Sequence, residues 1–258
     1  MLIDSHCHLD PTAFDDAAEV LTRARAAGVA AFVVVGVAPT LDAARFAVGL
    51  AGTRADVRAV VGVHPHDAKV LTDEMLAELE EIARRPEVAA VGEMGLDYHY
   101  MSSPMDAQKD AFRRQIALAR RVGKPIVVHT RSAPADTIAI LQEEGARDVG
   151  GVIHCFSEDR PFAEGALDLG FDLSFSGIVT FKSAASVHEV AAWAPADRIL
   201  LETDSPYLAP VPLRGKTCEP AYLVHTARRV AALRGRPVEE IIDQTGQNTA
   251  RRFGLPSA

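Results

Sequence analysis

Short apolar runs alternate along the chain with longer segments in which apolar residues recur at helical spacing. Eight runs rich in β-branched residues predict buried strands at residues 2–8, 30–37, 57–64, 88–95, 125–130, 151–156, 171–177 and 199–204. Segments such as 15–28 and 73–86 predict the intervening helices, several of which should stop at Gly28, Pro86, Gly123 and Gly170. A final pair of helices is expected at 219–234 and 238–252.

This alternation predicts an α/β protein built as one (β/α)8 (TIM) barrel. Strands that are apolar almost throughout and separated by helices indicate a parallel sheet that is buried on both faces. Eight such units in 258 residues match the size of a closed barrel. An open doubly wound sheet is the alternative, but no GxGxxG phosphate loop follows the first strand. No repeat or low-complexity linker divides the chain, so we expect residues 1–258 to form a single domain.

Polar residues interrupt the predicted strands at their carboxyl-terminal ends. In a β/α barrel these ends form the rim on which active sites are built, so side chains far apart in sequence are expected to meet there. The residues concerned are His6, His8, His64, Glu93, His129, His154 and Asp204.

The types and spacing of these residues predict metal binding. His6 and His8 lie two residues apart and share one face of a strand, whereas Cys7 points to the other face. Glu93 stands in an apolar run with no adjacent Lys or Arg, and burying a bare carboxylate would cost several kcal/mol. A bound metal ion would remove that cost. Glu202 shares the face of Asp204 and either orients a metal ligand or forms an internal ion pair.

Histidine nitrogens and carboxylate oxygens suit Zn, Mn, Fe, Co or Ni, and carboxylate-rich sites also admit Mg. Cys155 faces away from His154, which argues against a structural zinc site with thiolate ligands. The number of ligands predicts two divalent cations per subunit with Glu93 between them, an arrangement that suits hydrolysis.

Composition excludes several other classes of protein. A formal net charge of -8 argues against broad wrapping of duplex DNA, although not against nucleic acid bound at a small metal-rich site. No apolar run approaches the ~20 residues that span a bilayer, and no signal peptide is evident. Three cysteines, Cys7, Cys155 and Cys218, do not suggest a disulfide framework. We therefore expect a cytoplasmic protein with reduced thiols, and nothing in the sequence suggests an obligate oligomer.

The chain also resembles the TatD-type metal-dependent deoxyribonucleases, a branch of the amidohydrolase-like barrel hydrolases. The stretches that carry the resemblance are, in family order, "DSHCHLD", "GVHPHDA", "GEMGLDYHY", "KPIVVHTRSA", "IHCFS", "SGIVTFK" and "LLETDSPYLAP". The resemblance implies that one ion is bound by His6, His8, Glu93 and Asp204, and the other by Glu93, His129 and His154. It also implies that Asp204 orients or deprotonates the attacking water, and that the substrate is DNA, often cleaved from the 3′ end of single strands. Where the family has an Asn, this chain reads "RGKTCEP" with Cys218, which leaves the details of substrate choice open.

Other residues near the strand ends are candidates for substrate contacts. These are His64, His66, Arg131, Lys182, Arg214 and Lys216, each of which is otherwise a surface group. Tyr98 and Phe156 are candidates for stacking on a base, with core packing as the alternative. Two other functions stay open. The same metal site suits an ester or amide hydrolase, acting for example on a misacylated tRNA or a lactone, and the barrel could have become a binding protein without catalysis.

Overall fold

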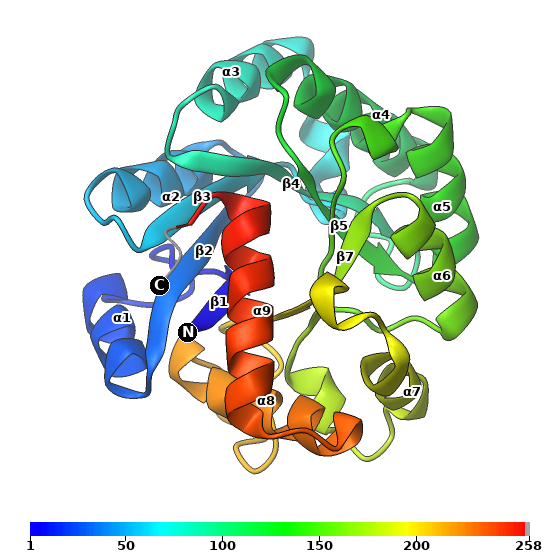
Figure 1. Cartoon of the computed structure of the whole chain (residues 1–258). Helices are drawn as coiled ribbons and strands as arrows, with labels where there is room; N and C mark the ends of the chain where they lie inside the picture. The colour runs from blue at the N-terminus through cyan, green and yellow to red at the C-terminus, as the bar shows by residue number, and fades with distance from the viewer. Residues whose placement is uncertain (256–258) are drawn as a thin grey trace.

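The eight predicted strands form one parallel sheet in chain order, and this sheet curves into a nearly closed barrel with the helices around it (Figure 1). The computed structural model describes residues 1–255. The strands are β1 (Leu2–Cys7), β2 (Val29–Val37), β3 (Val57–Gly62), β4 (Val88–Asp97), β5 (Ile126–Arg131), β6 (Gly151–Ile153), β7 (Phe171–Phe175) and β8 (Ile199–Leu201). The predicted (β/α)8 barrel is therefore confirmed.

A helix follows nearly every strand and packs its apolar face on the outside of the barrel. The helices are α1 (Ala17–Ala26), α2 (Asp42–Gly52), α3 (Asp73–Ala83), α4 (Met105–Val122), α5 (Pro134–Glu143), α6 (Arg160–Asp168), α7 (Ala185–Trp193), α8 (Leu223–Arg234) and α9 (Val238–Phe253). Short 3-10 turns occupy Pro65–Val70, Ala146–Asp148, Gly177–Thr180, Ala196–Arg198 and Pro220–Tyr222. The expected final pair of helices corresponds to α8 and α9. Gly123 ends α4 in the left-handed conformation that glycine adopts readily.

Seven of the eight strands end one to three residues from the predicted position, and only β2 ends where expected. β4 continues to Asp97, two residues beyond the expected end, whereas β6 and β8 stop three residues early. The early ends have a local cause, because Cys155 and Asp204 have positive φ angles of 46° and 56° that are incompatible with an extended strand. His154 and Asp204 therefore lie in the loops that follow β6 and β8.

The amino-terminal end of the barrel is closed by an apolar plug. Inward-facing residues near the strand starts, among them Ile3, Val127 and Leu200, form a buried cluster with Phe253 and Leu255 from the end of α9. Figure 1 shows α9 lying across the strands, and it packs against both β1 and β8. We call this cluster the α9 plug.

Polar contacts hold the α9 plug in place. The fully buried carboxylate of Asp172 on β7 accepts hydrogen bonds from Arg252 of α9 at 2.7 Å and from Arg198 at 2.6 Å. Gly246 allows α9 to approach the start of the chain closely, because a Cβ there would lie 1.9 Å from the carbonyl oxygen of Met1. No helix within residues 1–255 is long and apolar enough to cross a membrane.

The first and last strands meet at the opposite, carboxyl-terminal end. The backbone N–H of Asp204 donates to the carbonyl of His6 at 3.0 Å, and that of His8 donates to the carbonyl of Ser205 at 2.8 Å. These bonds bring residues from the two ends of the chain into one rim, which we call the mouth of the barrel.

Candidate metal centre

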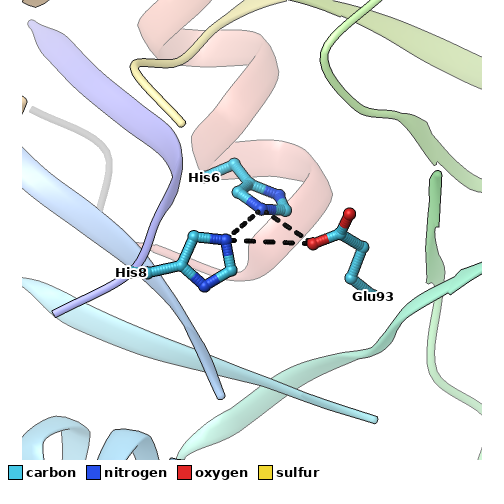
Figure 2. Close-up of side chains that lie close together, drawn as sticks. All are labelled: His6, His8 and Glu93. Atoms are coloured by element: carbon cyan, nitrogen blue, oxygen red, sulfur yellow. Dashed lines mark hydrogen bonds and ion pairs between the residues drawn. The ribbon is translucent and has the colours of Figure 1, made fainter. Parts of the chain in front are cut away.

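A first group of donor atoms lies at the mouth between β1 and β4. The Nε2 atom of His6 is 3.3 Å from Nε2 of His8 and 3.3 Å from Oε2 of Glu93 (Figure 2). Oδ1 of Asp204 completes the group, 3.8 Å from Nε2 of His6 and 3.6 Å from Nε2 of His8. Ligands about 2.1 Å from a tetrahedral ion would lie about 3.4 Å from one another, so this spacing suits a common metal ion.

A second group surrounds the other oxygen of the same carboxylate. Oε1 of Glu93 lies 2.8 Å from Nε2 of His154 and 3.0 Å from Nδ1 of His129. Nε2 of His64 is 3.2 Å from this oxygen, which places His64 beside the second group. The sequence had given His64 both as one of the rim residues and as a candidate substrate contact. Glu93 therefore lies between the two groups and presents one oxygen to each.

The strands bring these side chains together because their inward positions change from apolar to polar toward the mouth. On β5 and just after β6, the inward valines Val127 and Val152 are followed two residues later by His129 and His154. The approach of β4 to β5 requires glycine at residue 95, because a Cβ there would lie 2.0 Å from the carbonyl oxygen of His129.

Two further carboxylates fix the orientation of the histidines. Nδ1 of His154 donates to Glu202 at 3.2 Å, so Nε2 faces the donor groups. His129 is turned the other way, because its Nε2 donates to Asp97 at 3.3 Å and its Nδ1 faces Glu93. Such carboxylate partners set the ring orientation and the basicity of metal-binding histidines. Asp97 was missed by the sequence reasoning, although its position at the end of β4, inside "GLDYHY", was a usable signal.

Electrostatics within the centre favour an ionised carboxylate among the imidazoles. Burial alone would raise the pKa of Glu93, but electrostatic interaction with the His154 and His64 imidazoles and a hydrogen bond with His129 hold it well below its usual range. Burial lowers the pKa of His154, yet Glu93 and Glu202 raise it well above its ordinary value. Burial lowers the pKa of His64 to about 4. The groups around Glu93 thus favour its ionised form.

The chemistry of these donors fits divalent cations. Glu93 is only 3% exposed, and neither it nor Asp204 forms an ion pair with Lys or Arg in the part of the chain that the structure describes. The histidines are the charged neighbours of these carboxylates, and neutral imidazole is a common metal ligand. A cation at this position would supply the positive charge that the fold does not.

Comparison with known proteins agrees with this geometry. The family model for TatD related DNases matches residues 3–254. The chain belongs to the TatD-related DNase family. It is 44% identical to the "uncharacterized metal-dependent hydrolase YabD" of Bacillus subtilis, over 99% of this chain and 100% of the relative. It is 34% identical to the "3'-5' ssDNA/RNA exonuclease TatD" of Pantoea vagans, over 98% of this chain and 100% of that protein.

The crystal structure of YJJV, a TatD homologue from Escherichia coli, superposes on this chain with a TM-score of 0.91 and 28% identity. The match covers 99% of this chain and 98% of that one. The resemblance noted in the sequence is therefore confirmed, and the chain is a hydrolase of the TatD-related family.

Backbone strain in this TatD-family hydrolase is concentrated at the mouth. Five residues other than glycine have positive φ angles within residues 1–255, and all five follow β4, β5, β6 or β8: Met101, Ser132, Cys155, Asp204 and Leu208. Each such conformation costs about 1–3 kcal/mol and persists only where surrounding contacts impose it. The shape of the mouth is thus maintained against local backbone preference, as is typical of functional sites.

The candidate substrate contacts of the TatD-family chain also lie around the mouth. Four of these candidates are cations without a carboxylate partner in the described part of the chain: Arg131, Lys182, Arg214 and Lys216. The guanidinium of Arg131 instead lies 4.6 Å from the ring centroid of Tyr100, and that of Arg214 lies 3.9 Å from that of Phe181. Nε2 of His66 donates to Asp97 at 2.8 Å. Their contacts with a substrate stay predictions.

Three other residues discussed from the sequence make contacts within the protein. Phe156 is 1% exposed and packs in the core, so base stacking by this residue is excluded and the core-packing alternative is correct. Tyr98 is half-buried, and its hydroxyl donates to Asp136 on α5 at 2.7 Å. Cys218 is fully buried with its thiol 3.9 Å from the carbonyl of Thr203, so its side chain does not face a substrate.

Proposed function

We propose that this TatD-family hydrolase is a nuclease that binds two divalent cations and cleaves phosphodiester bonds of DNA, from the 3′ ends of single strands. In this proposal His6, His8, Glu93 and Asp204 hold one cation, and Glu93, His129 and His154 hold the other. The observation that supports it best is the position of Glu93, whose two oxygens lie 3.3 Å and 2.8 Å from histidines of different groups. Mg, Mn, Zn and Ni all accept this set of ligands.

The chain's own residues would prepare the water and hold the substrate. When bound, the cations supply a Lewis acid that activates water and neutralises charge on the phosphate. Burial raises the pKa of Asp204, but a hydrogen bond from His8 and positive charge on His154 and His6 lower it below its usual value. Asp204 is therefore ionised at neutral pH and able to orient the water and accept its proton. Its backbone N–H, bonded to His6, fixes the position of this carboxylate.

The charges around the mouth suit a short, flexible stretch of nucleic acid. His64, His66 and Arg131 lie on the side of β3 to β5, whereas Lys182, Arg214 and Lys216 lie on the side of β7 and β8. A chain with a net charge of -8 has no excess of cations for tracking along a duplex, so binding would depend on these few groups and on the metals. The relative named as a 3'-5' ssDNA/RNA exonuclease supports this class of substrate.

The proposal is tested with the purified protein, Mg²⁺ or Mn²⁺ and end-labelled single-stranded DNA. Asp204→Asn should fold normally and release nucleotides at least about 100-fold more slowly, as expected for the loss of a general base. His225→Ala, on α8 and outside both donor groups, is the matched control and should be as active as wild type. Equal rates for wild type and Asp204→Asn would exclude the role given to Asp204.

The same assay separates the alternative chemistry. Wild type is offered single-stranded and duplex DNA, RNA, simple esters and a D-aminoacyl-tRNA. Fast ester cleavage without cleavage of any phosphodiester would replace the nuclease proposal by the ester hydrolase. The monomeric state and the cytoplasmic location stay predictions, and light scattering of the purified protein tests the first.

A further inference from the structure

The large apolar side chains that the TatD-family fold leaves in solvent are gathered at the mouth. Within residues 1–255, the exposed members of this class are Val70, Tyr100, Met101, Met105, Tyr207 and Val211. All of them lie in segments that follow β3, β4 or β8 on the carboxyl-terminal side of the barrel. Exposed apolar side chains gathered on one face mark a surface that contacts a ligand.

Two tyrosines stand out in this set because they lie on opposite sides of the metal centre. Tyr100 follows β4 and Tyr207 follows β8, and in the ring of eight strands three strands separate β4 from β8 in either direction. The ring of Tyr207 is 6.2 Å from that of His8, and the ring of Tyr100 is 5.5 Å from that of His66. As whole residues, Tyr207 and Tyr100 are 61% and 58% exposed, respectively. The centre therefore lies between two accessible aromatic surfaces.

Both tyrosines are held in place by acidic residues of the centre. The backbone N–H of Tyr100 donates to the carboxylate of Asp97 at 2.8 Å, and the same carboxylate orients His129. The backbone N–H of Tyr207 donates to the carbonyl of Asp204 at 2.9 Å. The positions of the rings are thus fixed relative to the atoms proposed to perform the reaction.

The backbone around the tyrosines is also held in conformations that residues other than glycine rarely adopt. Met101 follows Tyr100 with a φ angle of 52°, and Leu208 follows Tyr207 with a φ angle of 56°. Arg131 lies against the Tyr100 ring and has no carboxylate partner in the described part of the chain, so it remains available to a phosphate. An exposed ring beside an unpaired cation offers stacking and charge neutralisation together.

We propose that Tyr100 and Tyr207 are two base-stacking subsites, one on each side of the metal centre, that receive the unpaired bases flanking the cleaved phosphate. The inference rests on the nuclease function proposed above and adds how its substrate is recognised. Aromatic stacking is tolerant of sequence because every base has a π face, and it requires bases that are not already stacked in a duplex. The enzyme would then prefer single strands with little dependence on sequence.

The test combines variants of the protein with changes in the DNA. Tyr100→Ala and Tyr207→Ala should each lower kcat/KM on a single-stranded oligonucleotide by roughly 5- to 150-fold. Tyr100→Phe and Tyr207→Phe keep the ring and should stay within a few-fold of wild type. His225→Ala, on α8 and outside both donor groups and the exposed apolar set, is the control and should have no effect.

Abasic nucleotides identify which base each ring contacts. An abasic site on one side of the cleaved phosphate should slow cleavage by wild type. On that substrate Tyr100→Ala should cleave as fast as wild type, because the base that Tyr100 contacts is already missing. An abasic site on the other side should have the same effect for Tyr207→Ala. Such coupling between protein and DNA changes is the signature of direct contact. Equal losses on intact and abasic strands would show a merely structural role and overturn the inference.

A binding measurement separates this inference from the nuclease proposal. The fluorescence anisotropy of a labelled single strand is followed in EDTA, so no cleavage is needed. One outcome is that both Ala variants bind the strand more weakly than wild type, while wild type cleaves nothing when metal is added. That outcome would support the subsites and reject the nuclease function. Cleavage by wild type with no change in binding or in kcat/KM for either Ala variant would reject the subsites alone.

Discussion

Replacing Glu93 by glutamine removes one negative charge from the metal centre with almost no change in side-chain volume. The two oxygens of Glu93 lie within 4.0 Å of five imidazoles, those of His6, His8, His64, His129 and His154. A glutamine would keep the shape, but its amide supplies one weaker oxygen donor and no charge. The expected result is a folded protein that no longer gains stability from divalent cations.

The size of this effect follows from mass action. A ligand that binds only the folded state at 100 times its dissociation constant stabilises that state by about 2.7 kcal/mol. For 258 residues the entropy of unfolding is about 0.5 kcal/mol/K, so wild type should gain about 5 °C in Tm. Loss of the partners that orient metal ligands already weakens metal binding by about 10- to 100-fold. A loss of at least about 100-fold for Glu93→Gln leaves about 0.4 kcal/mol, or less than about 1 °C.

The assay is thermal unfolding followed by circular dichroism, first in EDTA and then with Mn²⁺ at a concentration fixed from the wild-type titration. Metal content after desalting provides a second measurement that does not depend on stability. His225→Ala removes an imidazole outside the centre and should show the full wild-type shift. A Glu93→Gln protein that binds Mn²⁺ and gains as much stability as wild type would refute the placement of Glu93 between two cations.

Three other substitutions test separate parts of the structure. Asp97→Asn should weaken metal binding by about 10- to 100-fold in competition with a fluorescent chelator, because it removes an orienting carboxylate, and unchanged affinity would contradict that role. Gly95→Ala should lower the free energy of unfolding in urea by at least about 3 kcal/mol, because its Cβ would overlap a carbonyl oxygen and its φ angle is 139°. Gly49→Ala, in open space on α2, should instead raise it by about 0.5–1 kcal/mol. Asp172→Ala should cost about 3–5 kcal/mol, because it leaves the half-buried Arg198 and Arg252 without their carboxylate partner. Asp148→Ala, whose carboxylate pairs with Arg120 at the surface, should cost less than about 1 kcal/mol. Similar costs for the two variants would contradict the importance of burial.

The barrel and much of the metal centre could be predicted from the sequence for a physical reason. A residue such as His129, in an otherwise β-branched run, is a strong signal because a buried strand tolerates few polar groups without a partner. Seven such residues at the ends of six predicted strands, including Glu93 and His154, define one rim once the strands are taken to be parallel. The periodicity also places Glu202 on the face of Asp204, and the structure shows that it orients His154.

Other features depend on tertiary contacts that the pattern of residues does not encode. The early end of β8 follows from the positive φ of Asp204, which a run of apolar letters cannot show. Asp97 resembles an ordinary polar residue after a strand, and only the fold brings it to His129 and His66. The exposure of Tyr100 and Tyr207 depends on loop geometry, whereas Phe156, in a similar position in the sequence, is buried.

The α9 plug and the packed interior of the barrel leave the mouth as the side from which the donor groups are reached. Because Phe253 and Leu255 fill the amino-terminal end, nothing that enters the mouth can leave on the far side. In the exonuclease proposed above, a single strand would therefore lie across the mouth without threading through the barrel, and both products would leave by the route of entry. Before each further cut, the shortened strand would have to shift over the mouth or dissociate. The number of cuts per encounter would therefore depend on how tightly residues of the mouth hold the strand, and not on a channel that encloses it.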